Sequence, residues 1–106
     1  MKNVMVRYTV RPDRVEENER YVSAVFEQLD HERPPGLRYA SFKLEDGVSF
    51  VHIVSVDTED AVNPLNAIPA FKAFTATVDE RCDERPVVSR LSEVGSYQWD
   101  RLGAGA

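Results

Sequence analysis

His52 is the residue of this chain whose type and position best suit it to chemistry. It lies in the middle of an apolar segment, between Val51 and Ile53. An imidazole in such surroundings can take a proton from a substrate or stabilise an anion, because its pKa is close to neutrality. A histidine at this position can equally belong to the core or to an interface, hydrogen-bonded to a neighbour. The sequence leaves both interpretations open.

Aromatic side chains are the second group of candidates for a binding site. Tyrosine and tryptophan rings can stack on a flat aromatic ligand while their polar atoms fix its orientation. The same rings, at alternate positions of a strand, can also serve packing alone, and phenylalanines of a helix can be core as well as pocket wall. The candidates for substrate binding are Tyr8, Tyr39, Phe71, Phe74, Tyr97 and Trp99.

Three arginines, Arg7, Arg38 and Arg90, fall within expected strands. A charged side chain there must face solvent, an interface or an anionic ligand. Arg7 is the one that we include among the substrate-binding candidates, as a group that can stabilise an oxyanion. The alternative is that these arginines pair with carboxylates across a dimer interface. Cys82 has no neighbouring base in sequence and is expected to be inert, and His31 is expected on the surface.

Composition and charge exclude several classes of function. A chain of 106 residues with a net charge of -5 is expected to form one domain, over 1–102 with a flexible tail at 103–106, and not to bind nucleic acid or an anionic membrane. One cysteine and two histidines cannot form a disulfide within the chain or a cysteine-rich zinc site. Motifs for nucleotides, flavins and metals are missing from the sequence, so no cofactor is expected.

The beginning of the sequence and its hydropathy predict a location. No apolar segment approaches the roughly 18–20 residues that a membrane span needs. The first residues have neither the long apolar stretch nor the small-residue cleavage site of a signal peptide. We therefore expect a cytoplasmic protein.

The pattern of apolar residues predicts two strand–helix units and a hairpin. Residues 4–10 alternate as a strand, and a helix from Val15 follows, with Asp13 as its N-cap, Glu16 completing a capping box, and an end by Arg33 before two prolines. Strands at 37–44 and 48–56 flank an Asp-Gly turn. A loop with a helical turn near Asp60 leads to a second helix that begins at Pro69.

The last strand is expected over 87–99, after a break at 83–86, with a bulge or bend near Gly95. The resulting order is α+β, ferredoxin-like βαββαβ: one antiparallel sheet with two helices on one face and the first and third strands in the centre. The third strand is apolar on both sides, but the helices cover only one. We expect a second copy of the chain to cover the other face; the alternative is a face left exposed or shielded only by tyrosines.

Three segments carry a resemblance to a known family. They are Val-Arg-Tyr-Thr-Val-Arg-Pro-Asp at 6–13, Pro-Ala-Phe-Lys-Ala-Phe at 69–74 and Val-Gly-Ser-Tyr at 94–97. On these, the stretch 3–99 resembles the antibiotic biosynthesis monooxygenase-like branch of the dimeric α/β-barrel superfamily. The resemblance implies a homodimer in which two sheets close around a barrel and each protomer keeps a pocket between helices and sheet. It also implies oxidation of phenols or quinols by O2 without metal, flavin or haem.

The resemblance makes a cofactor-independent monooxygenase for a small aromatic phenol or quinol the leading hypothesis, with His52 as the catalytic base. The competing hypothesis is a non-catalytic dimeric module that binds a hydrophobic ligand or serves a stress or regulatory role. A third is an isomerase or lyase that moves a proton in the same pocket. Haem-degrading members of this superfamily use an Asn, a Trp and an axial His. Alignment on the first turn and on the Phe71-Lys72 helix places Val6, Asp57 and Thr75 at these three positions, so haem is not expected.

Overall fold

Strands and helices of this chain form two layers in the computed structural model, which describes residues 2–58, 60 and 62–99. The tail predicted at 103–106 lies outside the described residues. Within them, none of the helices has the length and apolar character needed to cross a membrane. The described elements are β1 (Lys2–Val10), η1 (Pro12–Arg14), α1 (Val15–Glu32), β2 (Leu37–Lys43), β3 (Ser49–Val56), η2 (Pro64–Ala67), α2 (Pro69–Arg81) and β4 (Cys82–Leu91).

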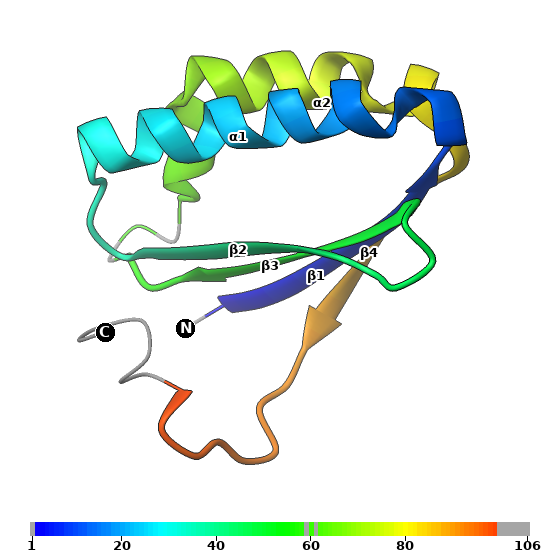
Figure 1. The fold of residues 1–106 in the computed structure, drawn as a ribbon. Coiled ribbons are helices and arrows are strands. Elements are labelled where there is room, and N and C mark those ends of the chain that lie inside the picture. Colours follow the sequence, from blue (N-terminus) through cyan, green and yellow to red (C-terminus); the bar gives the residue numbers. More distant parts are fainter. Residues whose placement is uncertain (1, 59, 61, 100–106) are drawn as a thin grey trace.

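The sheet is antiparallel with the strand order β2-β3-β1-β4, and α1 and α2 lie side by side on one of its faces (Figure 1). The predicted ferredoxin-like α+β fold is confirmed, including the central position of β1 and β3. Alternation along these two strands places one set of side chains against the helices. The buried apolar residues of this core include Tyr8, Val10, Val25, Phe50, Val54, Val56, Leu65, Phe74 and Val78.

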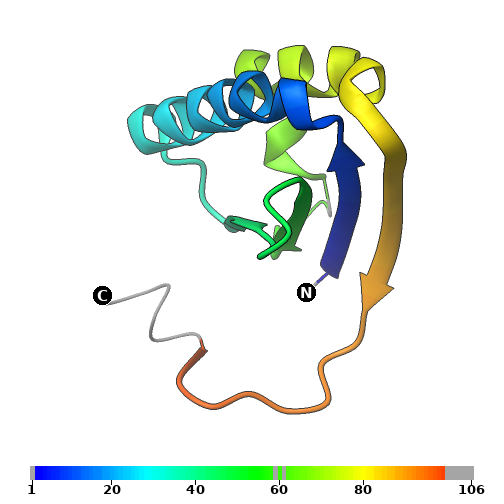
Figure 2. The same cartoon turned by 45° about the vertical axis from the view of Figure 1, so that its right-hand side comes forward.

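The opposite face of the sheet carries apolar side chains too. Met5 pairs with Ile53 across β1 and β3, and Val51 pairs with Phe42 across β3 and β2. Phe42 is exposed and Val51 and Ile53 are half-buried. No helix of the described residues lies on this side (Figures 1 and 2). We call it the open face, and it shows that β3 is apolar on both sides, as its sequence predicts.

The start of α1 differs from the predicted capping box. Pro12 opens a 3-10 turn, so Asp13 lies inside that turn and Arg14 occupies the N-cap without a side-chain cap. The Arg14 guanidinium instead pairs with Glu17, with Nε 2.6 Å from Oε1. Proline fixes φ near the helical value, which starts helical geometry early. The predicted end holds: Arg33 is left-handed (φ 47°) and its amide donates to the Leu29 carbonyl.

The last strand also differs from its predicted bounds, because β4 begins at Cys82 directly after α2 and ends at Leu91. The 83–86 segment, expected to be a break, belongs to the strand. Its register against β1 shifts between Arg7 and Thr9 and again between Thr9 and Val10, so the irregularity lies here and not near Gly95. Pro86 is tolerated because β4 is an edge strand and the register is irregular at this point.

The segment between β3 and α2 contains its helical turn at Pro64–Ala67, later than the turn expected near Asp60. The Asn63 side chain caps this turn by accepting a hydrogen bond from the Leu65 amide at 2.9 Å. Leu65 is fully buried, which anchors the segment below the helices. The second helix then begins at Pro69, as predicted.

Candidate functional site

His52 lies on the helix-covered face of β3 and is only 3% exposed. Its two ring nitrogens each meet a tyrosine hydroxyl: Tyr8 Oη is 2.7 Å from Nε2 and Tyr39 Oη is 2.6 Å from Nδ1. The register of the sheet explains this, because His52 pairs with Val6 of β1 and Ser41 of β2. Tyr8 and Tyr39 each lie two residues from these partners, on the same face of the sheet. The histidine is thus held between two phenols in the interior.

The hydrogen bonds continue from Tyr8 into the helices. Asn18 of α1, fully buried, donates from Nδ2 to Tyr8 Oη at 2.9 Å, and Arg81 of α2 donates from Nε to Asn18 Oδ1 at 3.1 Å. We call the series Tyr39, His52, Tyr8, Asn18 and Arg81 the buried polar chain. It connects β2 with the end of α2 through the centre of the core.

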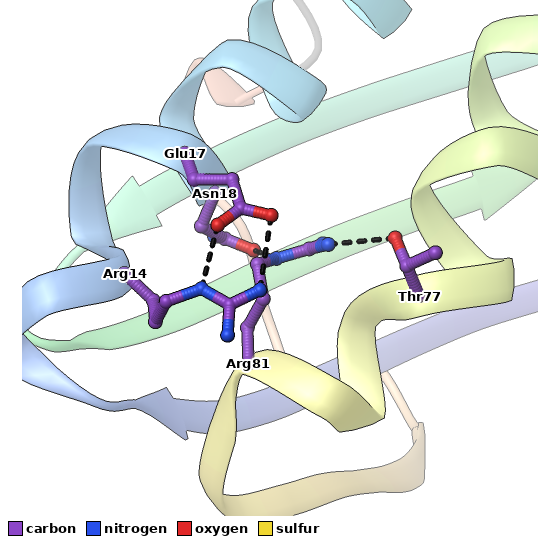
Figure 3. Close-up of polar contacts among 5 residues, drawn as sticks. All are labelled: Arg14, Glu17, Asn18, Thr77 and Arg81. Carbon is purple, nitrogen blue, oxygen red and sulfur yellow. Dashed lines mark hydrogen bonds and ion pairs between the residues drawn. The ribbon is translucent and has the colours of Figure 1, made fainter.

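Arg81 is a buried cation that forms no ion pair with a carboxylate among the described residues, although its charge acts on nearby Glu17. Figure 3 shows its guanidinium between Asn18 on α1 and Thr77 on α2, where Nη1 donates to Thr77 Oγ1 at 2.7 Å. Nη2 is buried and has no hydrogen-bond partner. The guanidinium carbon lies 4.3 Å from the centre of the Tyr21 ring and 5.6 Å from that of Phe74, so aromatic faces compensate part of the charge.

Burial sets the protonation states of His52 and the two tyrosines in the buried polar chain. It lowers the pKa of His52 to about 4, because the charged imidazolium loses its hydration in the core. Burial also raises the pKa of Tyr8 and Tyr39, since a phenolate would lose more hydration than the phenol. At neutral pH the site therefore holds a neutral imidazole between two neutral phenols.

A surface cavity of about 310 Å³ lies between α1 and the β2–β3 hairpin. Its walls combine apolar side chains with a charged pair, in which Lys43 Nζ lies 2.8 Å from Glu19 Oε1. The lining residues are Glu19, Val22, Ser23, Phe26, Ser41, Lys43 and Phe50.

Ser41 connects this cavity with the buried polar chain. Its Oγ lies 3.4 Å from His52 Nε2, so it is a cavity-lining residue that reaches the imidazole. Phe26 provides a second link, because its ring stacks on Tyr39 with centroids 5.0 Å apart. A ligand in the cavity would be separated from His52 by the Ser41 hydroxyl.

The structure brings five of the predicted site residues together. Tyr8 and Tyr39 bind the imidazole, Phe74 packs against it at 5.4 Å between centroids, and Phe71 contacts both Tyr39 and Phe74 at 6.4 Å. With His52 they form one aromatic cluster beneath α2. Their contacts with one another are packing contacts, and the binding role of these rings stays a prediction.

The other three predicted site residues lie elsewhere. Arg7 is exposed, at a position of β1 that pairs with Val51 on the open face. Tyr97 is 85% exposed and Trp99 56%, both in the segment that follows β4. This segment extends away from the helical layer (Figures 1 and 2), since the last strand ends at Leu91 and does not carry these rings along the sheet.

Three residues of the site, Asn18, Ser41 and Arg81, were not predicted from the sequence. Each has a signal, however. Asn18 lies on the apolar stripe of α1 between Val15 and Val22, and Arg81 continues the stripe of α2 after Val78. Ser41 shares a face of β2 with Tyr39. A polar residue on an apolar face indicates a buried hydrogen bond.

Among the described residues, no group of three or more His, Cys, Asp or Glu side chains lies close enough together to hold a metal ion. Cys82 opens β4 beside Arg81, and burial raises the pKa of its thiol. A thiol with a raised pKa is a poor nucleophile.

Comparison with known proteins gives structural relatives only. No family model matches the sequence, and no curated protein matches it. Rv0793 from Mycobacterium tuberculosis has a TM-score of 0.72 at 21% identity, over 90% of this chain and 96% of its own. A structure named antibiotic biosynthesis monooxygenase has a TM-score of 0.73 at 17% identity, over 90% and 100%. A Nitrosomonas europaea protein of unknown function, NE2512, has 0.69 at 11% identity, over 91% of both chains.

These similarities extend over almost the whole chain, and their identities are low enough that they concern the fold. Relatives named for the same family recur among the solved structures. The layer order, the antiparallel sheet and the two helices agree with them. The chain has the fold of the antibiotic biosynthesis monooxygenase-like proteins.

Proposed function

We propose that this chain is a cofactor-independent monooxygenase-like protein that oxidises a small phenol or quinol held in the cavity. The observation that carries the proposal is the contact between Ser41, which lines the cavity, and Nε2 of His52, a neutral imidazole. The phenylalanine rings of the wall, Phe26 and Phe50, suit a flat aromatic ligand. Lys43 also lines the cavity; its ammonium, which pairs with Glu19, is the cation that an anionic oxygen of the ligand would meet.

The reaction needs a base and dioxygen. The substrate hydroxyl gives its proton through Ser41 to Nε2 of His52, and the resulting electron-rich phenolate reduces O2. One oxygen atom enters the substrate and the other leaves as water, so the substrate supplies all the electrons. A pKa of about 4 makes His52 a weak base in the empty protein. A phenolate forming next to Ser41, one hydroxyl away from the imidazolium, raises that pKa, because opposite charges stabilise each other.

The test is oxygen uptake with a panel of hydroquinones and polycyclic phenols. His52→Ala is expected to lower uptake by roughly 10²-fold or more, the usual contribution of a general base. His52→Gln, which keeps more of the side-chain volume, guards against loss of the fold, and His31→Ala on the surface is the matched control. Full activity of both His52 variants would remove the histidine from the mechanism. No turnover across the panel would contradict the class of reaction.

A non-catalytic, ligand-binding module is the second candidate, and one observation favours it. Nε2 has one lone pair, and the Tyr8 hydroxyl at 2.7 Å competes for it with Ser41 at 3.4 Å. In this alternative the buried polar chain serves only the structure. The protein would then bind flat aromatic ligands saturably by calorimetry, without oxygen uptake or product.

We also propose that two copies of the chain associate through the open face. Exposed Phe42 and the half-buried Val51, Ile53 and Met5 give this face an apolar centre that the chain's own helices do not cover. An isologous dimer is the simplest cover. With one cysteine, and so no disulfide within the chain, the proposed setting is the cytoplasm.

A further inference from the structure

We infer that Arg81 and Asn18 are positioning residues that hold His52 in one tautomer, with the hydrogen on Nδ1 and the unprotonated nitrogen, Nε2, on the side of Tyr8 and Ser41. The inference rests on the proposed function for its catalytic meaning. Its structural content follows from the direction of each hydrogen bond in the buried polar chain.

The direction is set at Arg81. A guanidinium has only N–H donors, so the atom of Asn18 that lies 3.1 Å from Arg81 Nε must be the acceptor Oδ1. This fixes the amide orientation and turns Nδ2, a donor, towards Tyr8 at 2.9 Å. Arg81 and Asn18 are both fully buried, so water does not offer them other partners.

The direction passes to His52 through Tyr8. The Tyr8 oxygen accepts from Asn18, and its own hydrogen needs an acceptor because the side chain is 1% exposed. Nε2 of His52, at 2.7 Å, is that acceptor and is therefore unprotonated. A hydrogen on Nε2 would leave the Tyr8 hydroxyl hydrogen without a partner in the core.

The remaining ring nitrogen completes the assignment. Neutral imidazole carries one hydrogen, so Nδ1 holds it and donates to Tyr39 Oη at 2.6 Å. Ser41, at 3.4 Å, can then only be a second and weaker donor to the Nε2 lone pair that Tyr8 already occupies at 2.7 Å, which leaves the lone pairs of its oxygen to accept from a hydroxyl in the cavity. Arg81 and Asn18, which do not line the cavity, thus direct the basic nitrogen towards it.

The substitution Asn18→Asp tests the direction with almost no change of shape. A carboxylate accepts and cannot donate, so it would take one hydrogen bond from Arg81 and one from the Tyr8 hydroxyl. Tyr8 would then accept from Nε2–H, and Nδ1 would become the acceptor for Tyr39. The histidine would change tautomer although its neighbours remain.

The measurement is ¹⁵N NMR of the histidine rings in the full chain without ligand. The inference predicts a protonated Nδ1 and an unprotonated Nε2 for His52, reversed in Asn18→Asp and unchanged in the control Tyr39→Phe. In Arg81→Met, where the amide is free to turn, both tautomers are expected. The inference would be overturned by a wild-type His52 protonated on Nε2, or by an Asn18→Asp spectrum without the reversed tautomer. If Asn18→Asp does not fold, an Arg81→Met protein whose His52 keeps a single tautomer would overturn it instead.

Activity separates this inference from the proposed function. If wild-type protein consumes oxygen with quinols, Asn18→Asp is expected to lose roughly 10²-fold in kcat, because the base no longer faces Ser41, and a reversed tautomer with full activity would overturn the positioning role. If no quinol is oxidised, the proposed function fails, but the NMR result still decides the tautomer.

Discussion

Tyr8 Oη lies 2.7 Å from His52 Nε2, across the two central strands of the sheet. The same oxygen accepts the Asn18 amide, so one buried hydroxyl serves a strand and a helix at once. Ring packing surrounds it, with Phe50 stacked on Tyr8 at 5.5 Å between centroids. The site of interest and the core of the protein are therefore built from the same atoms.

Removing that hydroxyl is expected to destabilise the fold. Tyr8→Phe leaves the Asn18 amide and His52 Nε2 with fewer partners in the interior, which costs about 1–3 kcal/mol of unfolding free energy. Tyr97→Phe, at an exposed tyrosine, should change it by less than about 0.5 kcal/mol. Urea unfolding of the three proteins measures both values. Equal stability of Tyr8→Phe and wild type would show that the chain of hydrogen bonds contributes nothing net.

The free energy of unfolding is expected to decrease as the pH is lowered, over a pH range set by the pKa of His52. Burial lowers its pKa to about 4 from an ordinary 6.5, so between these values the unfolded chain binds a proton that the folded chain does not. The contribution to stability is complete above pH 6.5 and decreases as the pH falls towards 4, by about 3 kcal/mol in all.

The difference in unfolding free energy between wild type and His52→Gln isolates this term from the carboxylates that titrate in both proteins. Urea titrations at several pH values should show that this difference becomes smaller on acidification, because wild type loses stability that His52→Gln never had. A difference that stays constant from neutral pH to pH 4 would mean that the imidazole is hydrated in the folded protein.

Two glycines with positive φ offer a matched pair for the turns. Gly36 has φ +76°, and a Cβ there would lie 2.5 Å from the Asp57 carbonyl oxygen, whereas Gly47 has φ +78° and open space around it. Gly47→Ala should cost about 1 kcal/mol for the backbone alone, and Gly36→Ala about 2–3 kcal/mol because a backbone clash is added. Thermal melts compare the two; an equal cost would contradict the contact between Gly36 and the segment after β3.

The proposed dimer makes its own prediction. Ile53→Glu places a charge in the centre of the open face, beside Met5 and Ala40, and should convert a dimer to a monomer. Thr75→Glu on the exposed side of α2 is the control and should leave the mass unchanged. Sedimentation equilibrium gives the answer. A wild-type monomer at all concentrations would contradict association through this face.

The fold was largely predictable because its signals are local and agree with one another. Alternation in β1 and β3, the Asp-Gly turn and the proline before α2 each indicate one structure. The errors in the last strand arose where the residue types do not match the backbone conformation that they adopt. The charged residues and Pro86 in the first half of β4 are not typical of a strand, so this half was predicted as a break. Tyr97 and Trp99 favoured a strand beyond Leu91, where the structure has none among the described residues.

The site was predictable in part, since His52 stands out as a polar residue in an apolar strand. Its partners did not stand out, because each depends on which helix face meets which strand. Arg81 is the last residue of α2, and a charged side chain at a helix end is normally exposed, so its burial was not expected. Long-range pairs such as Asn18 with Arg81 depend on the packing of α1 on α2, which one sequence does not specify.

The central claim is that the cavity and His52 form one site through Ser41, and a ligand titration tests it most directly. The measurement follows the ¹⁵N resonances of the His52 ring while a hydroquinone is added to saturation. We predict that Nε2 shifts, that Nδ1 changes less, and that Ser41→Val, which removes the connecting hydroxyl, abolishes the shift. Saturable binding that leaves both His52 nitrogens unmoved would contradict the claim.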